Sequence, residues 1–175
     1  KEELNQRIHL FTREHGKILK EAHIEMTRIA DRFRHVAAYA DRLAEDEKLS
    51  GPPFDTIITR QPRGVAALIV PWNWPISILG AKLAQALIAG NTVVIKLSKE
   101  AAMAPAKTVG LMAEMLPDGV MNLLTGQASN IGDPLLSHPA IRTINFTGSV
   151  GIGKHVMKVA AENLTPVTLE LGGND

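Results

Sequence analysis

The sequence predicts an α/β protein: a parallel sheet with flanking helices, preceded by an N-terminal helical pair. The first fifty residues carry one apolar stripe with a helical period, and from residue 64 short apolar or β-branched runs alternate with helical stretches. Such alternation is typical of parallel strands joined by right-handed helical crossovers. We therefore divide the chain into a helical pair (1–50), a connecting strand or turn (51–63) and a sheet-forming unit (64–175).

The helical stripe is formed by apolar or small side chains three and four positions apart. They are Leu4, Ile8, Phe11, Ile18, Ala22, Met26, Ile29, Phe33, Val36, Ala40 and Leu43. Gly16 lies where a first helix could end, because a left-handed C-terminal residue costs glycine little. A second helix would then run from about Lys17 to Glu45. A coiled coil is the alternative, since the spacing is close to a heptad, but only some positions of the stripe are bulky.

Five strands and four intervening helices are expected after the Ser50–Pro53 breaker. The predicted strands are Gly64–Val70, Thr92–Lys96, Val120–Leu124, Arg142–Phe146 and Thr165–Leu169. The predicted helices are Ile76–Ile88, Ala101–Met115, Ile131–Leu136 and Val150–Glu162. The first two strands are nearly continuous apolar runs, as buried parallel strands are. Phe54–Arg60 alternates between Pro-containing turns and could be a strand outside this sheet.

Composition excludes several classes of function. The chain has 175 residues, enough for one domain, and a formal net charge of +1, so no positive excess marks it for nucleic acid or an anionic membrane. It has no cysteine, and therefore no disulfide, thiolate metal site or thiol nucleophile of its own. Apolar runs stop well short of the roughly 20 residues of a membrane span. We expect a soluble, cytoplasmic protein whose translation begins upstream of Lys1, because the start KEELNQ has no initiating Met and no signal segment.

Candidate functional groups follow the strands, because ligands of open α/β sheets bind at the carboxyl ends. The first strand leads into PWNWP, where two prolines stiffen the turn and Asn73 presents an amide that could stabilise an oxyanion. Asn73 could instead merely cap the following helix. The second strand ends at Lys96, which could contact a sugar or phosphate or could simply be solvated, and Ser98 is expected to be the N-cap of the next helix.

A glycine-rich turn follows the fourth strand and passes directly into a helix. In FTGSVGIG, glycines would let backbone N–H groups approach an anion at the helix N-terminus, so this turn is a candidate phosphate site. Its G-x-x-G-x-G spacing matches neither G-x-G-x-x-G nor the P-loop. The last strand leads to Glu170 between leucines, where burial would raise the carboxyl pKa toward the range of a general base. Glu170 could instead be a structural cap of the Gly-Gly turn. No histidine pair has metal-ligand spacing, so no metal site is expected.

Taken in order, these segments resemble the cofactor-binding part of the NAD(P)-dependent aldehyde dehydrogenase superfamily. The resemblance spans nearly the whole chain through FTREHGK, PRGVAALIVPWNWP, Lys82, GNTVVIKLSKE, FTGSVGIG and LELGG. It implies a three-layer Rossmann-like sheet and identifies residues 64–175 as an NAD(P)-binding domain, present here as a fragment. It further implies oxidation of an aldehyde to a carboxylic acid with NAD or NADP, through a cysteine thiohemiacetal and thioester.

The resemblance also assigns roles to single residues. Asn73 resembles the amide that holds the oxyanion, and Glu170 resembles the general base that activates water. On the cofactor, Lys96 resembles a ribose-binding lysine, while Gly148, Ser149 and Gly153 resemble residues at the pyrophosphate. The remaining residues assigned to cofactor binding by the resemblance are Val70, Trp72, Ser98, Lys99, Leu171 and Gly172. The role of Lys82, a family lysine beneath the site, is left open.

Two departures from the family pattern bear on function. The family's catalytic cysteine lies a few tens of residues beyond LELGG, whereas this chain stops at Asp175, so we expect the chain alone to be inactive. Secondly, the family commonly has an acidic residue at the position of Lys99, where it bonds the ribose 2′-hydroxyl. A lysine there favours tolerance of NADP, unless Lys99 points to solvent and Glu100 takes the place at the ribose.

Expectations about partners follow from the same resemblance. We expect a small-molecule aldehyde substrate, no nucleic acid or membrane, and a homo-oligomer, because family members pair through a surface and an arm that this chain includes in part. A different class of function also fits the missing cysteine: a stand-alone nucleotide-binding or interaction module without catalytic activity. A short-chain dehydrogenase is disfavoured, because the chain has no Tyr-x-x-x-Lys.

Overall fold

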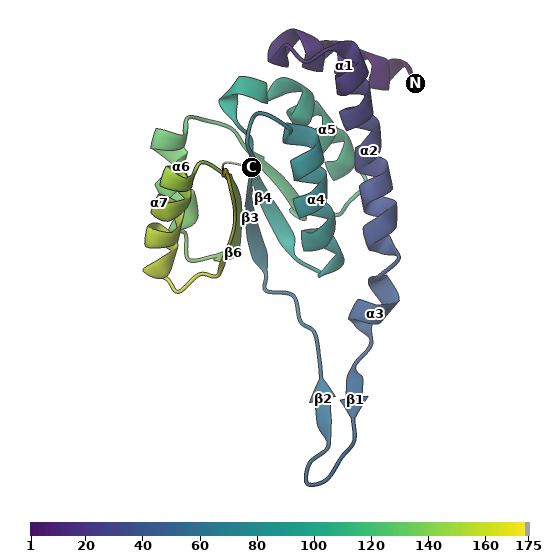
Figure 1. Ribbon diagram of the computed structural model, residues 1–175, viewed down its shortest axis with the longest axis vertical. Helices are drawn as coiled ribbons and strands as arrows, with labels where there is room; N and C mark the ends of the chain where they lie inside the picture. The colour runs from purple at the N-terminus through teal and green to yellow at the C-terminus, as the bar shows by residue number, and fades with distance from the viewer. Residues whose placement is uncertain (174–175) are drawn as a thin grey trace.

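The fold is α/β, as the sequence predicts, in a computed structural model that describes residues 1–173 (Figure 1). Residues 174 and 175, the end of the predicted 64–175 unit, lie outside the described residues. Five parallel strands form the main sheet in the order β5-β4-β3-β6-β7. Their bounds are β3 Val65–Ile69, β4 Thr92–Lys96, β5 Met121–Leu124, β6 Ile141–Gly148 and β7 Val167–Leu171.

Helices cover both faces of the sheet (Figure 1). One face packs against α4 (Pro75–Ile88) and α5 (Met103–Ala113), with Leu68, Leu83 and Ile95 in the apolar core between the layers. The other face packs against α6 (Ala128–Leu136) and α7 (Val150–Ala161) around Ile144 and Phe146. A 3₁₀ turn, η1 (Lys99–Ala101), precedes α5. The strands are thus buried on both faces, which explains their apolar sequences.

An N-terminal helical hairpin forms a further layer outside α4 and α5. Helix α1 (Glu2–His15) ends at Gly16, which has the predicted left-handed conformation (φ 79°), and Gly16 N–H donates to Thr12 O at 2.9 Å. Helix α2 (Leu19–Ala37) returns along α4, while α1 packs on α5. Phe11 and Met26 form a small apolar core with Ile76 of α4. The hairpin therefore buries its stripe against the body and does not form a coiled coil.

The prediction of one helix from Lys17 to Glu45 is wrong beyond Ala37. A short helix α3 (Ala40–Ala44) with no buried residue follows, and then an antiparallel arm of β1 (Glu47–Leu49) and β2 (Thr56–Ile58). The helix loses its packing partner where it leaves α4, and a helix without a buried face gains little stability. The arm extends away from the body (Figure 1), so a strand replaces the end of the predicted helical pair.

Strands β6 and β7 both extend further than predicted. Thr147 pairs with Glu170 and Gly148 with Leu171, so Gly148 and Glu170 lie within strands and not after them. The pairing continues because the backbone N–H and C=O groups of both strands can still form hydrogen bonds with each other here. Within the described residues no helix is long and apolar enough to cross a membrane.

Candidate functional site

The candidate site lies where the sheet reverses its strand order. From β3 the chain continues outward to β4 and β5, and it then returns to β6 on the other side of β3. Neighbouring loops diverge at such a point and leave a crevice at the carboxyl ends. Register brings the predicted segments to this one edge, because Ile69 pairs with both Lys96 and Phe146, and Thr147 pairs with Glu170.

Asn73 lies exposed in the corner between β3 and α4. Its Oδ1 accepts a hydrogen bond from Trp74 N–H at 3.0 Å, and within residues 1–173 its Nδ2 donates to no other protein group. The N-cap of α4 is Trp74, which makes no side-chain capping bond. The alternative that Asn73 caps the helix is therefore wrong, and the corner presents a free amide donor, the group that an oxyanion requires.

Helix α4 is capped instead by Glu25, a residue for which the sequence analysis gave no role. Glu25 of α2 is completely buried, and its Oε1 accepts from Ile76 N–H at 2.9 Å and from Ser77 N–H at 3.0 Å. Its Oε2 pairs with Lys17 Nζ at 2.5 Å. A signal for Glu25 was present in the sequence, because it lies three positions after Ala22 and four before Ile29 and so puts a charge into the apolar stripe of α2.

The same ion pair extends to the PWNWP corner. Lys17 Nζ donates to Asn73 O at 3.0 Å and lies 3.9 Å from the centre of the Trp74 ring. His15 Nε2 donates to Trp72 O at 2.8 Å, since a carbonyl oxygen can only accept. The helical hairpin thus holds the backbone carbonyls of Trp72 and Asn73 and the ring of Trp74 from outside the sheet.

The end of β4 gathers two lysines and one glutamate. Lys96 is buried, Nζ donates to Leu97 O at 3.1 Å, and desolvation lowers the pKa of Lys96 against the opposing charge of Glu100. Ser98 precedes only η1, whereas the N-cap of α5 is Ala102, so the prediction that Ser98 is the N-cap of the next helix is wrong. The Ser98 hydroxyl donates to the Glu100 carboxylate and caps no N–H group. This bond, joined by the charges of Lys99 and Lys96, holds the pKa of Glu100 below its usual range.

Lys99 itself extends into solvent beside Glu100. Its side chain is 72% exposed, and Nζ lies 3.9 Å from Glu100 Oε1. A pair this exposed contributes at most about 1 kcal/mol to stability. Both residues that the sequence analysis weighed for the ribose, Lys99 and Glu100, are therefore exposed at the same turn.

Helix α7 begins directly at the carboxyl end of β6. Ser149 is its N-cap, and Ser149 Oγ accepts from Ile152 N–H at 3.4 Å. The first turn, VGIG, carries no acidic side chain and is open to an anion at the positive end of the helix. On the opposite face of β6, the face of Asn145 and α4, the Thr147 hydroxyl is buried without a hydrogen-bond partner among the described residues. The open first turn of α7 indicates a polar ligand there.

Gly148 and Gly153 of this segment each lie where a side chain would not fit. A Cβ on Gly153 would lie 2.5 Å from Leu171 Cδ2, so Gly153 lets α7 approach the end of β7 closely. Its N–H already donates to Ser149 O at 2.9 Å, within the helix. A Cβ on Gly148 would meet the Phe146 ring at 2.5 Å. Both glycines thus have a packing role in this structure, whereas their predicted contact with a pyrophosphate stays a prediction.

Glu170 is exposed, contrary to the expectation that apolar neighbours bury it. Strand β7 is the edge of the sheet, so nothing within residues 1–173 covers its outer side. Its charge acts on Lys82 of α4, a buried lysine whose pKa is lowered to about 8, chiefly by desolvation, with Glu170 opposing the shift. Lys82 donates to Asn145 Oδ1 of β6.

The other predicted cofactor residues also lie near the carboxyl ends of the strands. Val70 is buried, and its N–H donates to Lys96 O at 3.2 Å, whereas the Trp72 side chain is 56% exposed. Leu171 is 38% exposed, and Gly172 N–H donates to Gly148 O at 3.3 Å. In the described part of the chain, no three His, Asp or Glu side chains gather to hold a metal ion.

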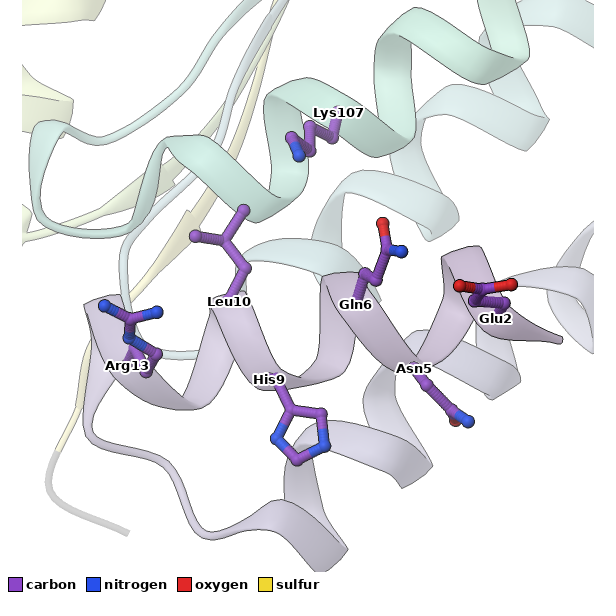
Figure 2. A pocket seen from close by; sticks show the side chains of 7 residues that line it. All are labelled: Glu2, Asn5, Gln6, His9, Leu10, Arg13 and Lys107. Atoms are coloured by element: carbon purple, nitrogen blue, oxygen red, sulfur yellow. The ribbon is translucent and has the colours of Figure 1, made fainter.

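A hollow lies elsewhere, between α1 and α5 (Figure 2). Its volume is about 470 Å³, and it contains none of the predicted site residues. Figure 2 shows Leu10 and Gln6 of α1 pointing toward Lys107 of α5, whereas His9 projects from the opposite side of α1. These side chains are mostly exposed, and no ion pair or hydrogen bond joins them, so the groove lacks the buried polar groups of a built site.

Comparison with known proteins identifies relatives along the whole chain. The sequence matches the aldehyde dehydrogenase family over residues 1–175. It is 40% identical over 170 residues to 2,5-dioxopentanoate dehydrogenase of Saccharolobus solfataricus, covering 95% of this chain and 36% of that protein. It is likewise 40% identical over 171 residues to betaine aldehyde dehydrogenase 1 of Oryza sativa, covering 94% and 34%. The chain thus spans about a third of the length of these relatives.

Solved structures give the same result for the fold. A betaine aldehyde dehydrogenase from Staphylococcus aureus, in complex with NAD+, superimposes with a TM-score of 0.91 at 35% identity, covering 98% of this chain and 35% of that one. The NADP-dependent glyceraldehyde-3-phosphate dehydrogenase from Bacillus halodurans, complexed with NADP, gives 0.91 at 37% identity, covering 99% and 38%. At these identities the likeness extends to sequence as well as fold.

Proposed function

The chain belongs to the aldehyde dehydrogenase family, and from this premise we propose that it forms the NAD(P)-binding part of an enzyme that oxidises an aldehyde to a carboxylic acid. The observation that carries the proposal is the reversal of strand order, at which Asn73, Lys96 and the first turn of α7 all follow or end strands at the carboxyl ends of the sheet. Relatives solved with NAD+ and with NADP support the choice of cofactor.

The residues present fit such a dinucleotide. The first turn of α7, free of acidic side chains, suits the pyrophosphate. Lys96, with Ser98 and Lys99, would contact the adenosine ribose. The other residues proposed to contact the cofactor are Val70, Trp72, Gly148, Ser149, Gly153, Leu171 and Gly172. The cofactor, when bound, supplies the hydride acceptor.

Two groups of this chain would act on the substrate. Asn73 Nδ2, unused by the protein in the described residues, would donate to the oxyanion that forms when a thiolate attacks the aldehyde carbon. Glu170 would take a proton from the water that hydrolyses the thioester. The thiolate must come from outside these 175 residues, because they contain no cysteine.

Activity measurements test this function. NAD(P)H formation from propanal or benzaldehyde should occur with the complete enzyme and be lost in the 175-residue chain, because the covalent step has no nucleophile there. In the complete enzyme Asn73→Ala should lower kcat about 10²- to 10³-fold, the effect of one lost oxyanion donor. Aldehyde oxidation by the purified chain above that of its Glu170→Gln variant would overturn the proposal.

A second candidate function rests on the missing cysteine. The chain could serve as a stand-alone nucleotide-binding or interaction module without catalysis, since neither the crevice nor α7 needs a thiol. Nucleotide binding by the chain combined with a parent reading frame that encodes no downstream cysteine would favour this second function. A downstream cysteine would favour the enzyme.

We also propose that the enzyme is a cytoplasmic homo-oligomer in which the β1–β2 arm makes contacts between subunits. The arm exposes apolar side chains, with Phe54 79% and Ile57 59% exposed, and its strands pair only with each other. Exposed apolar edges of this kind favour association. Analytical ultracentrifugation should detect self-association at high micromolar concentration, and a strictly monomeric chain would count against it.

A further inference from the structure

We propose that the buried ion pair of Lys17 and Glu25 positions Asn73 for the oxyanion, so that both are positioning residues of the reaction proposed above. The inference rests on the proposed role of Asn73. The pair comes from the N-terminal hairpin, whereas Asn73 lies about fifty residues later in the corner between β3 and α4.

The contacts of the ion pair show how it holds the corner. Glu25 holds the start of α4 through the N–H groups of Ile76 and Ser77, at 2.9 and 3.0 Å. Lys17 holds the carbonyl of Asn73 at 3.0 Å, and its ammonium lies over the Trp74 ring. The two are joined at 2.5 Å. The backbone carbonyl of Asn73 and the N–H groups that begin α4 are therefore attached to a single buried pair.

The choice of groups points to positioning and not to stability. A Ser or Asp at the N-cap would satisfy the start of α4 locally. A buried ion pair, by contrast, loses the hydration of two charges, and apolar residues of the same size are often as stable or more so. The pair instead fixes the backbone conformation of the corner, because its carboxylate binds two backbone N–H groups there and its ammonium binds a backbone carbonyl. The side-chain amide of Asn73 is carried by that backbone.

The neighbouring helix α5 offers a matched control. Glu14 of α1 caps α5 in the same way, accepting from Met103 N–H and Ala104 N–H at 2.8 Å each. Like Glu25, it is a carboxylate of the N-terminal hairpin that accepts from the first N–H groups of a helix on this sheet face. Within residues 1–173, however, its side chain makes no contact with the Asn73 corner. Removing the Glu14 cap therefore loosens a helix of the same sheet face without changing the orientation of Asn73.

Loss of the pair should slow the step in which the oxyanion forms. A displacement of about 1 Å at a reacting group can cost up to about 100-fold in rate. We expect a 10- to 100-fold slower burst of NADH formation in the complete enzyme carrying Lys17→Met with Glu25→Met. Both charges leave together in this variant, so no unpaired charge is buried. Glu25→Gln combined with Lys17→Met keeps an acceptor for Ile76 and Ser77 without burying an unpaired charge and should recover part of the rate. Glu14→Met should stay within about threefold of wild type.

A double-mutant cycle separates positioning from a general loss of structure. If the pair acts through Asn73, the double Met change should lower the burst rate no further once Asn73 is Ala. The dissociation constant for NAD+ should change less than about twofold. Hydrogen exchange at the Ile76 and Ser77 amides should accelerate in the double Met variant and stay slow in Glu14→Met. This difference would show that the double Met change removes the hydrogen bonds at the start of α4.

Three results would overturn the inference. The first is a double Met variant with fast exchange at Ile76 and Ser77 but a wild-type burst rate. If Asn73→Ala nevertheless has a slow burst, this result would refute the positioning role and leave the oxyanion role of Asn73 intact. Losses that add fully to those of Asn73→Ala would show an effect independent of the amide. If Asn73→Ala itself keeps the wild-type burst rate, the proposed oxyanion role fails, and the positioning role fails with it.

Discussion

The ammonium of Lys82 on α4 donates to Oδ1 of Asn145 on β6, across the point where the sheet reverses its strand order. The lysine is buried, and its pKa of about 8 is far below the usual value of 10.5 because burial disfavours its charge. Glu170 acts in the opposite direction and keeps that pKa from falling further. The proposed general base is thus coupled electrostatically to a lysine whose pKa is about 8.

Lys82 should make the stability of the chain depend on pH in alkaline solution. Between about pH 8 and pH 10.5 the unfolded chain keeps the Lys82 proton while the folded chain loses it. The unfolded state then binds more protons, so the Lys82 contribution to the free energy of unfolding increases as pH rises through this window. Urea unfolding at several pH values should show this rise in wild type and a smaller one in Lys82→Met. Equal slopes in both proteins would contradict the assignment.

Gly153 should be intolerant of a side chain for a packing reason. A Cβ there would lie 2.5 Å from Leu171 Cδ2, whereas a Cβ on Gly151 in the same helix would meet nothing within 4 Å. Gly153→Ala should therefore lower the free energy of unfolding by about 1 kcal/mol or more. Gly151→Ala should raise it by about 0.5–1 kcal/mol. Leu171→Ala should relieve the loss in Gly153→Ala, and an equal effect of the two glycine changes would argue against this contact.

Lys99 should decide how well the complete enzyme uses NADP. A lysine at the ribose removes the repulsion of a 2′-phosphate and can pair with it, and a charge-assisted contact of about 1–3 kcal/mol corresponds to tenfold or more in kcat/KM. Lys99→Glu should lower the NADP to NAD ratio of kcat/KM by that factor, while Lys158→Glu on the exposed face of α7 should leave it unchanged. A ratio unaffected by Lys99→Glu but raised by Glu100→Gln would assign the ribose to Glu100.

Elements with a strong local pattern could be predicted from the sequence, and the residues that join distant elements could not. Thr92–Lys96 was predicted with its observed bounds because a buried parallel strand is a continuous apolar run. Strand β1 has no such pattern, since Glu47–Leu49 carries two charges and pairs only within the arm. The exposure of Glu170 depends on its edge position, which its leucine neighbours do not reveal.

The same limit applies to the site. Asn73 and Lys96 could be proposed because each follows or ends a predicted strand, and the carboxyl ends of parallel strands lie together. Ser149 was proposed through the family resemblance. Glu25 and Lys17 act on residues about fifty positions away, so no local spacing connects them to the corner. Only the charge of Glu25 within an apolar stripe could have drawn attention to it.

The most direct test of the account is to map where NAD+ binds on this chain. Backbone amide resonances of the 175-residue protein, followed by NMR during titration with NAD+, should shift at residues 70–74, 96–100 and 147–153, the three loops at the strand-order reversal. Amides lining the groove between α1 and α5, among them His9 and Lys107, should remain in place. Shifts confined to that groove, or no shifts at millimolar NAD+, would contradict the proposed dinucleotide site.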